Sequence, residues 1–358
     1  MTVLIAGGGT GGHLYPGIAV ARALTSPGMD VQVTFVGTAA GIESTVVPRE
    51  RFPLDLIRSA GLKGKSLGSV VRGLALLPLS AWDAWRVISR RAPDVVVGVG
   101  GYSSGPVVAL AALRGIPTLV MEQNAAPGLT NRLLARVVRA AAVTFEASVA
   151  RFGGKAVVTG NPVRSEFFQP AAARPSDRPR LLVFGGSQGA HAINAAMAAA
   201  ADELAASVPG LQVTHQTGPR DADVVRDAYR RAGIDARVEP FLYEMHQEMH
   251  AADVVVCRSG ATTLAELAAA GKAAILIPLP TATDDHQRAN AAAMAAAGAA
   301  VLLDQREAGS SRLAREIASL CADRPARERM GRAAAALARP DAAAEIAARI
   351  IGLAGARV

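Results

Sequence analysis

The chain has 358 residues, enough for two domains, and 51% of them are hydrophobic while only 4% are aromatic. Alanine and valine supply much of this hydrophobic content, which is typical of helices packed on buried parallel strands. The two cysteines are too few for a disulfide framework or a cysteine metal cluster, and they favour a reducing compartment. The net charge of +8 admits anionic partners such as phosphates, acidic lipid or nucleic acid.

The N-terminus and the apolar runs indicate no targeting or membrane-spanning segment. No basic stretch precedes the first apolar run, which is only as long as a strand, so we expect no signal peptide. No run reaches the roughly 18 uninterrupted apolar residues of a transmembrane helix. The sequence therefore predicts a soluble or peripheral protein.

The first predicted element is a strand over residues 2–6, and it runs directly into the glycine-rich loop 7–12 and His13. Glycines let backbone N–H groups approach a ligand, and the N-terminus of the following helix carries a positive dipole end. This pattern predicts a diphosphate site with a possible base. It is also compatible with a tight turn and nothing more.

The same glycines satisfy the G-x-G-x-x-G fingerprint of dinucleotide-binding enzymes. Those enzymes carry a ribose-binding acid roughly 20 residues later, whereas the strand expected here over residues 31–36 ends in Gly37 and Thr38. The missing acid disfavours an oxidoreductase. A P-loop is disfavoured as well, because Ser59 stands where the first glycine of a motif ending at residues 64–66 belongs.

Residues 63–91 form a basic and apolar segment with six basic residues, one acid and both tryptophans of the chain. This composition is typical of an element that lies on a membrane surface. The residues expected to contact lipid are Lys63, Lys65, Arg72, Leu74, Leu77, Leu79, Trp82 and Trp85. A helix that faces the core and has solvated arginines is the alternative. Single-stranded nucleic acid is disfavoured because few stacking aromatics are available.

Strands and helix-length segments alternate along the rest of the chain, which predicts the α/β class. Further buried strands are expected over residues 94–99, 117–121, 156–159, 181–184, 213–216, 253–257 and 273–278. A second glycine-rich loop, residues 185–190, follows the strand at 181–184. Two such strand, loop and helix units predict two nucleotide-fold halves that face one cleft. The proline-containing stretch 169–180 is interpreted as a linker or a long surface loop.

Two polar segments of the second half follow predicted strands, where open α/β sheets bind ligands. In the first, residues 257–266, a helix N-terminus offers an anion site, and Glu266 could accept hydrogen bonds from a ribose diol or could simply favour the positive helix end. In the second, Gln287 and Asn290 are three residues apart on a predicted helix, and their amides suit sugar hydroxyls.

The motifs taken together resemble those of the MurG family, over essentially the whole chain and in order. They lie at residues 8–13, 100–106, 122–124, 160–164, 185–190 and 258–266. The resemblance implies a GT-B fold, with an N-terminal Rossmann-like domain over 1–165, a C-terminal one over 166–340 and a last helix over 341–358 that crosses back to the first domain. It also implies an inverting transfer of GlcNAc from UDP-GlcNAc to lipid I, undecaprenyl-diphosphoryl-MurNAc-pentapeptide, to make lipid II.

The resemblance also implies which residues bind the donor and what the reaction needs besides them. Donor binding falls on Asn124, Arg164, Ser187, Phe241, Leu242, Glu266, Gln287 and Asn290. Arg164 and Ser187 are expected near the diphosphate and Glu266 on the ribose. No cofactor and no metal are expected, because no Asp-x-Asp motif stands in a fitting place. His286 stands where some relatives carry glutamine, which puts donor contacts of that position in doubt.

Acceptor binding is implied for Thr10, Gly11, Gly12, His13 and Tyr102. His13 is a candidate general base or a hydrogen-bond donor to the acceptor diphosphate, and Glu122 is a second candidate base that could equally cap the next helix. The expected partners are the two substrates, the cytoplasmic face of the membrane with its anionic lipid, and other cell-wall synthesis proteins. A nucleotide-sugar epimerase, or a glycosyltransferase with a soluble acceptor, remains the alternative function.

Overall fold

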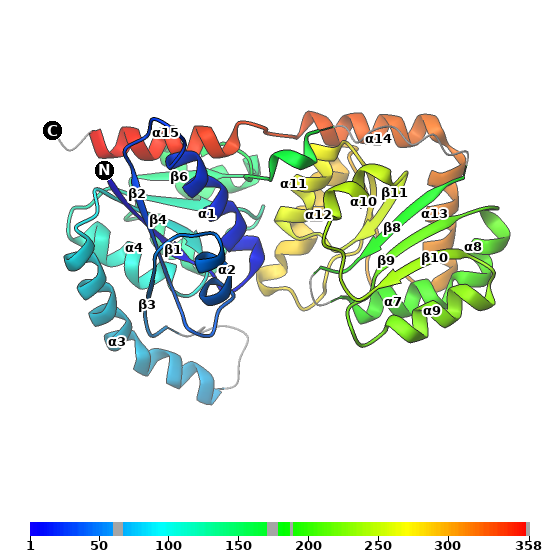
Figure 1. Ribbon diagram of the computed structural model, residues 1–358, viewed down its shortest axis with the longest axis horizontal. Coiled ribbons are helices and arrows are strands. Elements are labelled where there is room, and N and C mark those ends of the chain that lie inside the picture. Colours follow the sequence, from blue (N-terminus) through cyan, green and yellow to red (C-terminus); the bar gives the residue numbers. More distant parts are fainter. Residues whose placement is uncertain (60–66, 170–177, 187–188, 356–358) are drawn as a thin grey trace. The chain divides into compact units, whose positions relative to one another are not determined.

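The computed structural model describes residues 1–59, 67–169, 178–186 and 189–355, and it describes only the backbone of residues 67–75, Thr283 and Ser310. The chain divides into two compact units (Figure 1). One unit comprises Met1–Val163 and Arg339–Val358, and the other comprises Arg164–Ala338. These divisions lie two residues from each of the boundaries expected after 165 and 340. Most of the stretch expected to link the halves, 169–180, lies outside the described residues.

A seven-stranded parallel sheet forms the centre of the first unit, in the order β3-β2-β1-β4-β5-β6-β7. Its strands are β1 (Thr2–Gly7), β2 (Gln32–Gly37), β3 (Leu54–Leu56), β4 (Val95–Gly100), β5 (Thr118–Glu122), β6 (Ala140–Val143) and β7 (Ala156–Val158). The strand order reverses between β1 and β4. In open α/β sheets, the carboxyl ends of the strands at such a reversal are where ligands bind.

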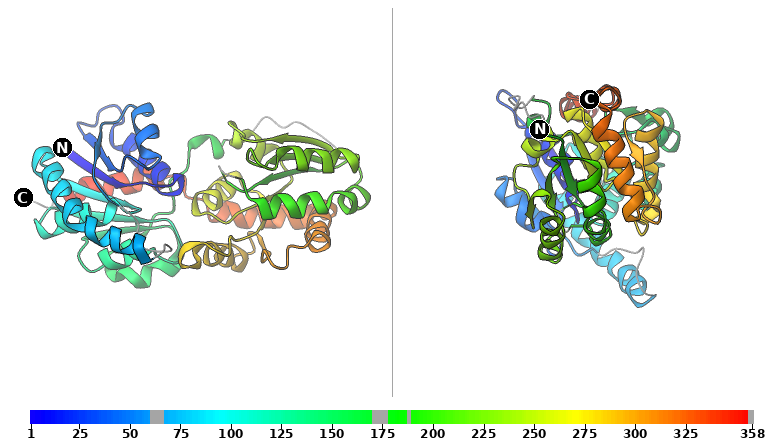
Figure 2. Two further views of the ribbon diagram at one scale, coloured as in Figure 1. Left: turned by 90° about the horizontal axis from the view of Figure 1, so that it is seen from below. Right: turned by 90° about the vertical axis from the view of Figure 1, so that its right-hand side faces the viewer.

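Helices cover both faces of this sheet (Figures 1 and 2). They are α1 (Gly11–Leu24), α2 (Glu43–Arg49), α3 (Leu67–Arg91), α4 (Ser104–Leu113), α5 (Leu129–Leu134), α6 (Val149–Phe152) and α15 (Ala342–Gly355), with 3₁₀ turns at Glu146–Ser148 and Gly153–Lys155. Alternate β1 residues enter two separate cores, Val3 and Ile5 on one face and Leu4 and Ala6 on the other. Burial on both faces explains the unbroken apolar run of β1.

The last helix, α15, belongs to the first unit although it ends the chain. Its residues Ile346, Ala347 and Ile350 are buried in the same core as Val3 and Ile5, and it packs against α1. Pro340 lies between α14 (Arg324–Ala336) and α15, where the sequence pattern predicts an interruption.

The second unit repeats the same strand order in a six-stranded parallel sheet, β10-β9-β8-β11-β12-β13. The strands are β8 (Arg180–Phe184), β9 (Gln212–Gln216), β10 (Asp235–Glu239), β11 (Val254–Cys257), β12 (Ala273–Leu276) and β13 (Val301–Leu302). Besides α14, the helices are α7 (His191–Ala199), α8 (Ala201–Ser207), α9 (Ala222–Arg231), α10 (Met245–Ala251), α11 (Ala261–Ala270), α12 (His286–Ala296) and α13 (Ser310–Ala322), with 3₁₀ turns at Ser165–Phe167 and Thr283–Asp285. The second glycine-rich loop follows β8, which lies at the reversal of this sheet.

Four strands are absent from the list expected from sequence, and each has a physical reason. β3 and β13 have only three and two residues, and both lie at the edge of their sheet. β10 is an edge strand with the sequence Asp-Ala-Arg-Val-Glu, so it lacks the apolar run of a buried strand. β6 contains three alanines, a residue with high helix propensity, and its sheet contacts override that propensity.

Candidate active site

The first glycine-rich loop places His13 between the carboxyl ends of β1 and β4. Helix α1 begins at Gly11, after an extended Thr10, and Thr10 Oγ1 lies 3.1 Å from His13 Nδ1. A Cβ at Gly100, the last residue of β4, would lie 2.7 Å from His13 Cδ2. Gly100 also has a φ of 94°, which disfavours any other residue. The imidazole is thus held against the end of β4 and remains partly exposed.

Tyr102 lies in the loop after β4, next to the glycine-rich loop that carries His13. Its side chain is 50% exposed, and its carbonyl oxygen accepts a hydrogen bond from Ser59 Oγ at 2.9 Å. Two residues earlier, the Gly100 carbonyl accepts from the Gly8 N–H at 3.3 Å, which joins the two loops. The structure therefore brings together the residues predicted to bind the acceptor, at the reversal of the first sheet.

Glu122 is buried at the end of β5 and is only 2% exposed. Its carboxylate accepts from Asn124 N at 3.0 Å and Asn131 Nδ2 at 2.9 Å, as well as from Gly128 N at 3.1 Å. Burial raises the pKa of this carboxyl, and these hydrogen bonds act against the rise. The geometry favours the capping alternative over the general base, because the carboxylate organises the loop that leads into α5.

Asn124 lies in the first unit, whereas the other predicted donor residues lie in the second. Its side-chain amide donates to Glu122 Oε1 at 3.3 Å, and its carbonyl oxygen accepts from Ser148 Oγ at 2.8 Å. The described contacts of Asn124 therefore hold the loop after β5.

In the second unit, the loop after β8 is held by a residue that the sequence interpretation missed. Gln216 is 2% exposed at the end of β9. Its Nε2 donates to the Gly186 carbonyl at 2.8 Å, and its Oε1 accepts from Leu242 N at 2.9 Å. The side chain thus connects the glycine-rich loop to Leu242, which the resemblance assigns to donor binding. Ser187 lies outside the described residues.

The Leu242 N–H is accordingly engaged inside the protein, and the Leu242 side chain is 6% exposed. The neighbouring Phe241 is 44% exposed, and its ring centroid lies 5.0 Å from that of Tyr243. The signal for Gln216 was available in the polar run 215–218, which begins within the last residues of the buried strand β9. Its partners were not predictable, since they lie about 30 residues away on either side.

A chain of buried hydrogen-bonded side chains lies next to Gln216, at the end of β9. Tyr229 Oη lies 2.9 Å from His215 Nδ1, and His215 Nε2 lies 3.1 Å from Asn194 Oδ1. Burial lowers the pKa of His215 to about 3, so the ring is neutral and one tautomer satisfies both contacts. Asn194 Nδ2 donates onward to the Thr217 carbonyl at 2.8 Å. The chain fixes α7 to the end of β9.

Glu266 and Arg164 interact electrostatically in the second unit. Part of the Glu266 side chain reaches solvent, but burial of its carboxyl raises its pKa to about 7, and the positive charge of Arg164 opposes this rise. The Arg164 guanidinium lies 5.2 Å from the centroid of the Phe167 ring. Glu266 is on α11, whose first helical amides follow Gly260 without a side-chain cap. The site therefore offers a titratable acceptor, a cation and a helix N-terminus.

The two side-chain amides predicted to bind sugar, on α12, both make hydrogen bonds within the second unit. Asn290 is fully buried, and its Nδ2 donates to the Ser259 carbonyl at 3.2 Å. Gln287 Oε1 accepts from Leu279 N at 3.0 Å, and its carbonyl oxygen accepts from Ser259 Oγ at 2.8 Å. These bonds fix the start of α12 to the loop before α11. Packing turns the Asn290 side chain inward, and its contact with sugar hydroxyls stays a prediction.

Comparison with known proteins decides the family. The glycosyltransferase family 28 N-terminal domain matches residues 3–143, and the family 28 C-terminal domain matches residues 180–346. The chain belongs to the MurG group of glycosyltransferase family 28. A UDP-N-acetylglucosamine–N-acetylmuramyl-(pentapeptide) pyrophosphoryl-undecaprenol N-acetylglucosamine transferase of Anaeromyxobacter sp. (strain K) is 48% identical, over 97% of this chain and 91% of its own.

Two further relatives of the MurG group agree with this assignment. The transferase of the same name from Myxococcus xanthus is 47% identical, over 97% of this chain and 91% of its own. The crystal structure of Acinetobacter baumannii MurG matches with a TM-score of 0.82 and 32% identity, over 98% of this chain and 99% of its own. The two parallel-sheet units are those of the GT-B fold.

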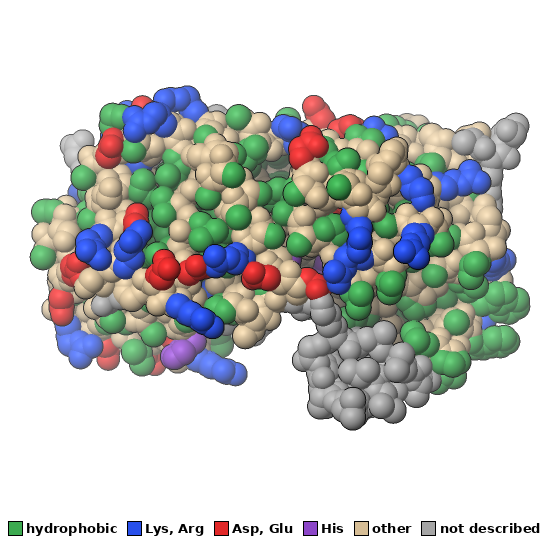
Figure 3. Space-filling model, turned by 180° about the vertical axis from the view of Figure 1, so that it is seen from behind, with side chains coloured by type: hydrophobic (Ala, Val, Ile, Leu, Met, Phe, Trp, Pro, Cys, Tyr) green, Lys and Arg blue, Asp and Glu red, His purple; other side chains and the backbone are tan. Residues whose placement is uncertain are grey.

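The residues that the resemblance to MurG assigns to the membrane lie on α3 and in the segment before it. The structure describes only some of their side chains. Lys63 and Lys65 are not described, and neither are the side chains of Arg72 and Leu74. The exposed apolar residues of the described part are Leu77, Leu79, Trp82 and Trp85. Figure 3 shows hydrophobic side chains gathered beside the grey segment. The indole rings of the two tryptophans are stacked, with centroids 5.5 Å apart.

The opposite stripe of α3 faces the core, with Ala84, Val87 and Ile88 buried. The helix therefore combines both alternatives, a core-facing stripe and an exposed aromatic pair. Arg90 and Arg91 at the end of the helix both pair with Asp55 of β3, and Asp83 pairs with Arg58. Neither this helix nor any other in the described part of the chain is long and apolar enough to span a membrane.

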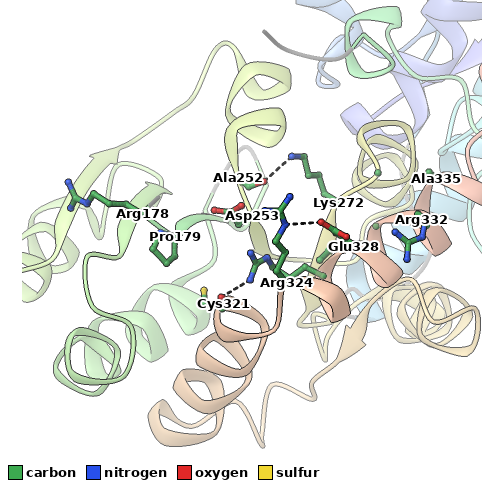
Figure 4. A pocket seen from close by; sticks show the side chains of 14 residues that line it. Arg178, Pro179, Ala252, Asp253, Lys272, Cys321, Arg324, Glu328, Arg332 and Ala335 are labelled. Atoms are coloured by element: carbon green, nitrogen blue, oxygen red, sulfur yellow. Dashed lines mark hydrogen bonds and ion pairs between the residues drawn. The ribbon is translucent and has the colours of Figure 1, made fainter. Parts of the chain in front are cut away.

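A basic groove of about 830 Å³ lies at the amino ends of the strands of the second unit (Figure 4). Two of its cations serve helix ends: Lys272 Nζ donates to the carbonyls of His250 and Ala252, and Arg327 donates to those of Leu320 and Cys321. Arg324 pairs with Glu328 at 2.8 Å. The groove is thus largely structural, and it lies at the sheet edge opposite to the glycine-rich loop.

Proposed function

We propose that this chain transfers N-acetylglucosamine from UDP-GlcNAc, with inversion, to the C4 hydroxyl of MurNAc in undecaprenyl-diphosphoryl-MurNAc-pentapeptide, giving lipid II. The observation that carries the proposal is 48% identity, over 97% of the chain, to a transferase named for these substrates. The glycine-rich loops after β1 and β8 support it, because each lies at the reversal of its sheet.

In the proposed mechanism, the second unit holds the donor. Glu266 accepts hydrogen bonds from the ribose, Arg164 and Ser187 contact the diphosphate, and the backbone around Phe241 and Leu242 contacts the uracil. As the bond between the anomeric carbon and UDP breaks, negative charge develops on the leaving diphosphate. A guanidinium and the positive end of the α11 helix dipole stabilise that charge.

The first unit holds the acceptor in this proposal. The loop that contains Thr10, Gly11 and Gly12 contacts the lipid diphosphate, and Tyr102 lines the sugar site. The C4 oxygen attacks the anomeric carbon from the face opposite to UDP, and His13 accepts the hydroxyl proton. The departing UDP takes the electron pair of the broken bond. No cofactor takes part in this scheme, and we propose that the chemistry is independent of metal.

Purified protein incubated with labelled UDP-GlcNAc and a lipid I analogue in detergent is expected to give a disaccharide-linked product and UDP in equal amounts. The same yield is expected with EDTA, since the scheme uses no metal. UDP release without transfer would contradict the proposed acceptor. A nucleotide-sugar epimerase would instead convert UDP-GlcNAc without any acceptor, so a reaction lacking lipid I is the matched control.

We further propose that the exposed face of α3 binds the cytoplasmic surface of the membrane at anionic lipid, and that other cell-wall synthesis proteins are partners of the chain. Trp82 and Trp85 are 56% and 46% exposed, and they present one stacked apolar surface. Tryptophan favours the interface between headgroups and acyl chains because its ring is apolar and its N–H is polar.

The double substitution Trp82→Ser and Trp85→Ser is expected to weaken binding to vesicles that contain anionic lipid by at least about tenfold, because burial of one large side chain contributes roughly 1.5–3 kcal/mol. Sedimentation with the vesicles measures this. Leu113→Ser is the matched control, since Leu113 is an 82% exposed side chain of α4 in the same unit. Unchanged sedimentation of the double variant would refute the proposed lipid contact.

A further inference from the structure

Glu43, the first residue of α2, is a buried acid to which neither the sequence motifs nor the proposed mechanism gives a role. The residue is 1% exposed. Its Oε2 accepts from Gly9 N at 2.8 Å, and its Oε1 accepts from Thr38 N at 2.8 Å and Thr38 Oγ1 at 3.0 Å. The carboxylate therefore joins the first glycine-rich loop to the turn that follows β2.

Three glycines enclose this carboxylate. A Cβ at Gly8 or Gly41 would overlap Glu43 Oε2, and a Cβ at Gly37 would overlap Glu43 Cγ. A side chain at any of the three would displace the carboxylate from its donors. Gly8 and Gly37, which follow β1 and end β2, thus make room for an internal anion.

The enclosed carboxylate is directly connected to the predicted acceptor site. Gly8 N donates to the Gly100 carbonyl at 3.3 Å, and a Cβ at Gly101 would overlap the Gly8 carbonyl. Gly100 contacts the His13 ring, and Tyr102 follows it by two residues. A shift of Gly8 and Gly9 would therefore move the groups against which His13 and Tyr102 are held.

We propose that Glu43 is the positioning residue of the acceptor site, in which its carboxylate takes the place of an anionic ligand at the Gly9 and Thr38 amides and so fixes the loop that carries His13. The inference rests on the proposed function. The proposal also explains how a glycine-rich loop of the nucleotide-binding type can serve another substrate. No ribose-binding acid stands at the end of β2. Glu43, six residues beyond Gly37, instead points inward and accepts hydrogen bonds from the Gly9 and Thr38 donors.

The proposal depends on the chemistry of a carboxylate and not on side-chain volume. Two backbone N–H groups and one hydroxyl converge on two anionic oxygens, and donors left unpaired in a buried site are costly. Glutamine has a similar shape but carries an NH₂ group that would face one of these N–H donors. Glu43→Gln is therefore expected to lose function almost as Glu43→Ala does.

The test is steady-state kinetics of the full chain with UDP-GlcNAc and a lipid I analogue, with formate as the probe. Glu43→Ala is expected to lower kcat/KM for the acceptor by about 10²-fold, since a misplacement of about 1 Å costs that much. The KM for UDP-GlcNAc is expected to stay within about twofold, because the predicted donor residues around Glu266 lie in the other unit. Formate should restore at least about tenfold, and chloride at equal ionic strength should not.

Glu50→Ala is the matched control. Glu50 directly follows α2, and its partly exposed side chain forms an ion pair with Arg22. Removal of the Glu50 carboxylate should therefore leave the kinetics unchanged. A formate-dependent rise in the melting temperature of Glu43→Ala, absent in the unsubstituted chain, tests the enclosed site without turnover. That readout stands even if lipid I is not the acceptor.

Three outcomes would overturn the proposal. One is full acceptor kinetics in Glu43→Gln. Another is a loss in Glu43→Ala that falls equally on the acceptor and on the donor KM. The third is the absence of any effect of formate on both turnover and melting temperature. An inactive unsubstituted chain that still shows formate-dependent stabilisation of Glu43→Ala would refute the proposed function and leave the enclosed carboxylate site standing.

Discussion

Replacement of His13 by alanine is expected to lower kcat by about 10²- to 10⁴-fold, the range that a positioned general base contributes. The KM for UDP-GlcNAc should stay unchanged, because the predicted donor residues other than Asn124 are in the other unit. The reason for choosing His13 is geometric: its ring is held between the ends of β1 and β4, where open sheets bind ligands, and it remains partly exposed. The carboxylate of Glu122, the other candidate base, accepts hydrogen bonds from the loop after β5 and from α5.

The rival role of His13 is a hydrogen bond to the acceptor diphosphate, and the kinetics separate the two. A diphosphate contact would raise the KM for the acceptor and leave kcat near its original value. Thr10→Val, which removes the hydroxyl 3.1 Å from His13 Nδ1, is expected to cost about tenfold in kcat, because it frees the ring orientation. A fall in kcat of less than about tenfold for His13→Ala, worth roughly 1.4 kcal/mol, would exclude an essential base at this position.

The affinity for UDP-GlcNAc is expected to rise by about tenfold between pH 6 and pH 8. Burial raises the pKa of Glu266 to about 7, so the ionised fraction grows from roughly one tenth to roughly nine tenths over this interval. The ionised carboxylate is the stronger acceptor for ribose hydroxyls, so the binding-competent fraction increases with pH. UDP-GlcNAc is the suitable ligand because its diphosphate, esterified at both ends, does not titrate in this range.

Calorimetric titration at several pH values measures this dependence, and Glu266→Gln is the matched control. Glutamine retains the shape and one acceptor oxygen but does not titrate, so its profile should be flat over the same interval. Glu266→Ala should weaken donor binding by about 10²-fold, which corresponds to the loss of two hydrogen bonds to a charged group. An unchanged affinity in Glu266→Ala would remove this residue from the ribose site.

The recurring difference between the sequence interpretation and the structure is that several predicted ligand groups are already bonded within the protein. Gly9 N donates to Glu43, Leu242 N donates to Gln216, and Asn290 Nδ2 donates to the Ser259 carbonyl. In each case the partner is between 26 and 34 residues away in sequence. Internal donors and acceptors of this kind hold the loops in shape before a ligand arrives.

The sequence by itself determined the α/β class, the two glycine-rich loops and the family. Apolar runs of strand length and loops of glycine are local patterns, and a long ordered set of motifs is specific without any knowledge of contacts. The sequence also predicted the break between the last two helices, because proline at position 340 interrupts the helical pattern. These features depend on neighbouring residues, which is why periodicity and composition are enough to predict them.

Only the tertiary structure decided which polar side chains bind inward. Glu43 and Gln216 could not be assigned from sequence because each bonds to a group of another loop, brought near when parallel strands align their carboxyl ends. Glu43 accepts from Gly9 N, and Gln216 bonds to the Gly186 carbonyl and to Leu242 N. Burial also separated His13, the first candidate base, from Glu122, the second. The physical reason is that burial and hydrogen-bond partners are properties of packing, and packing joins residues whose separation along the chain carries no signal.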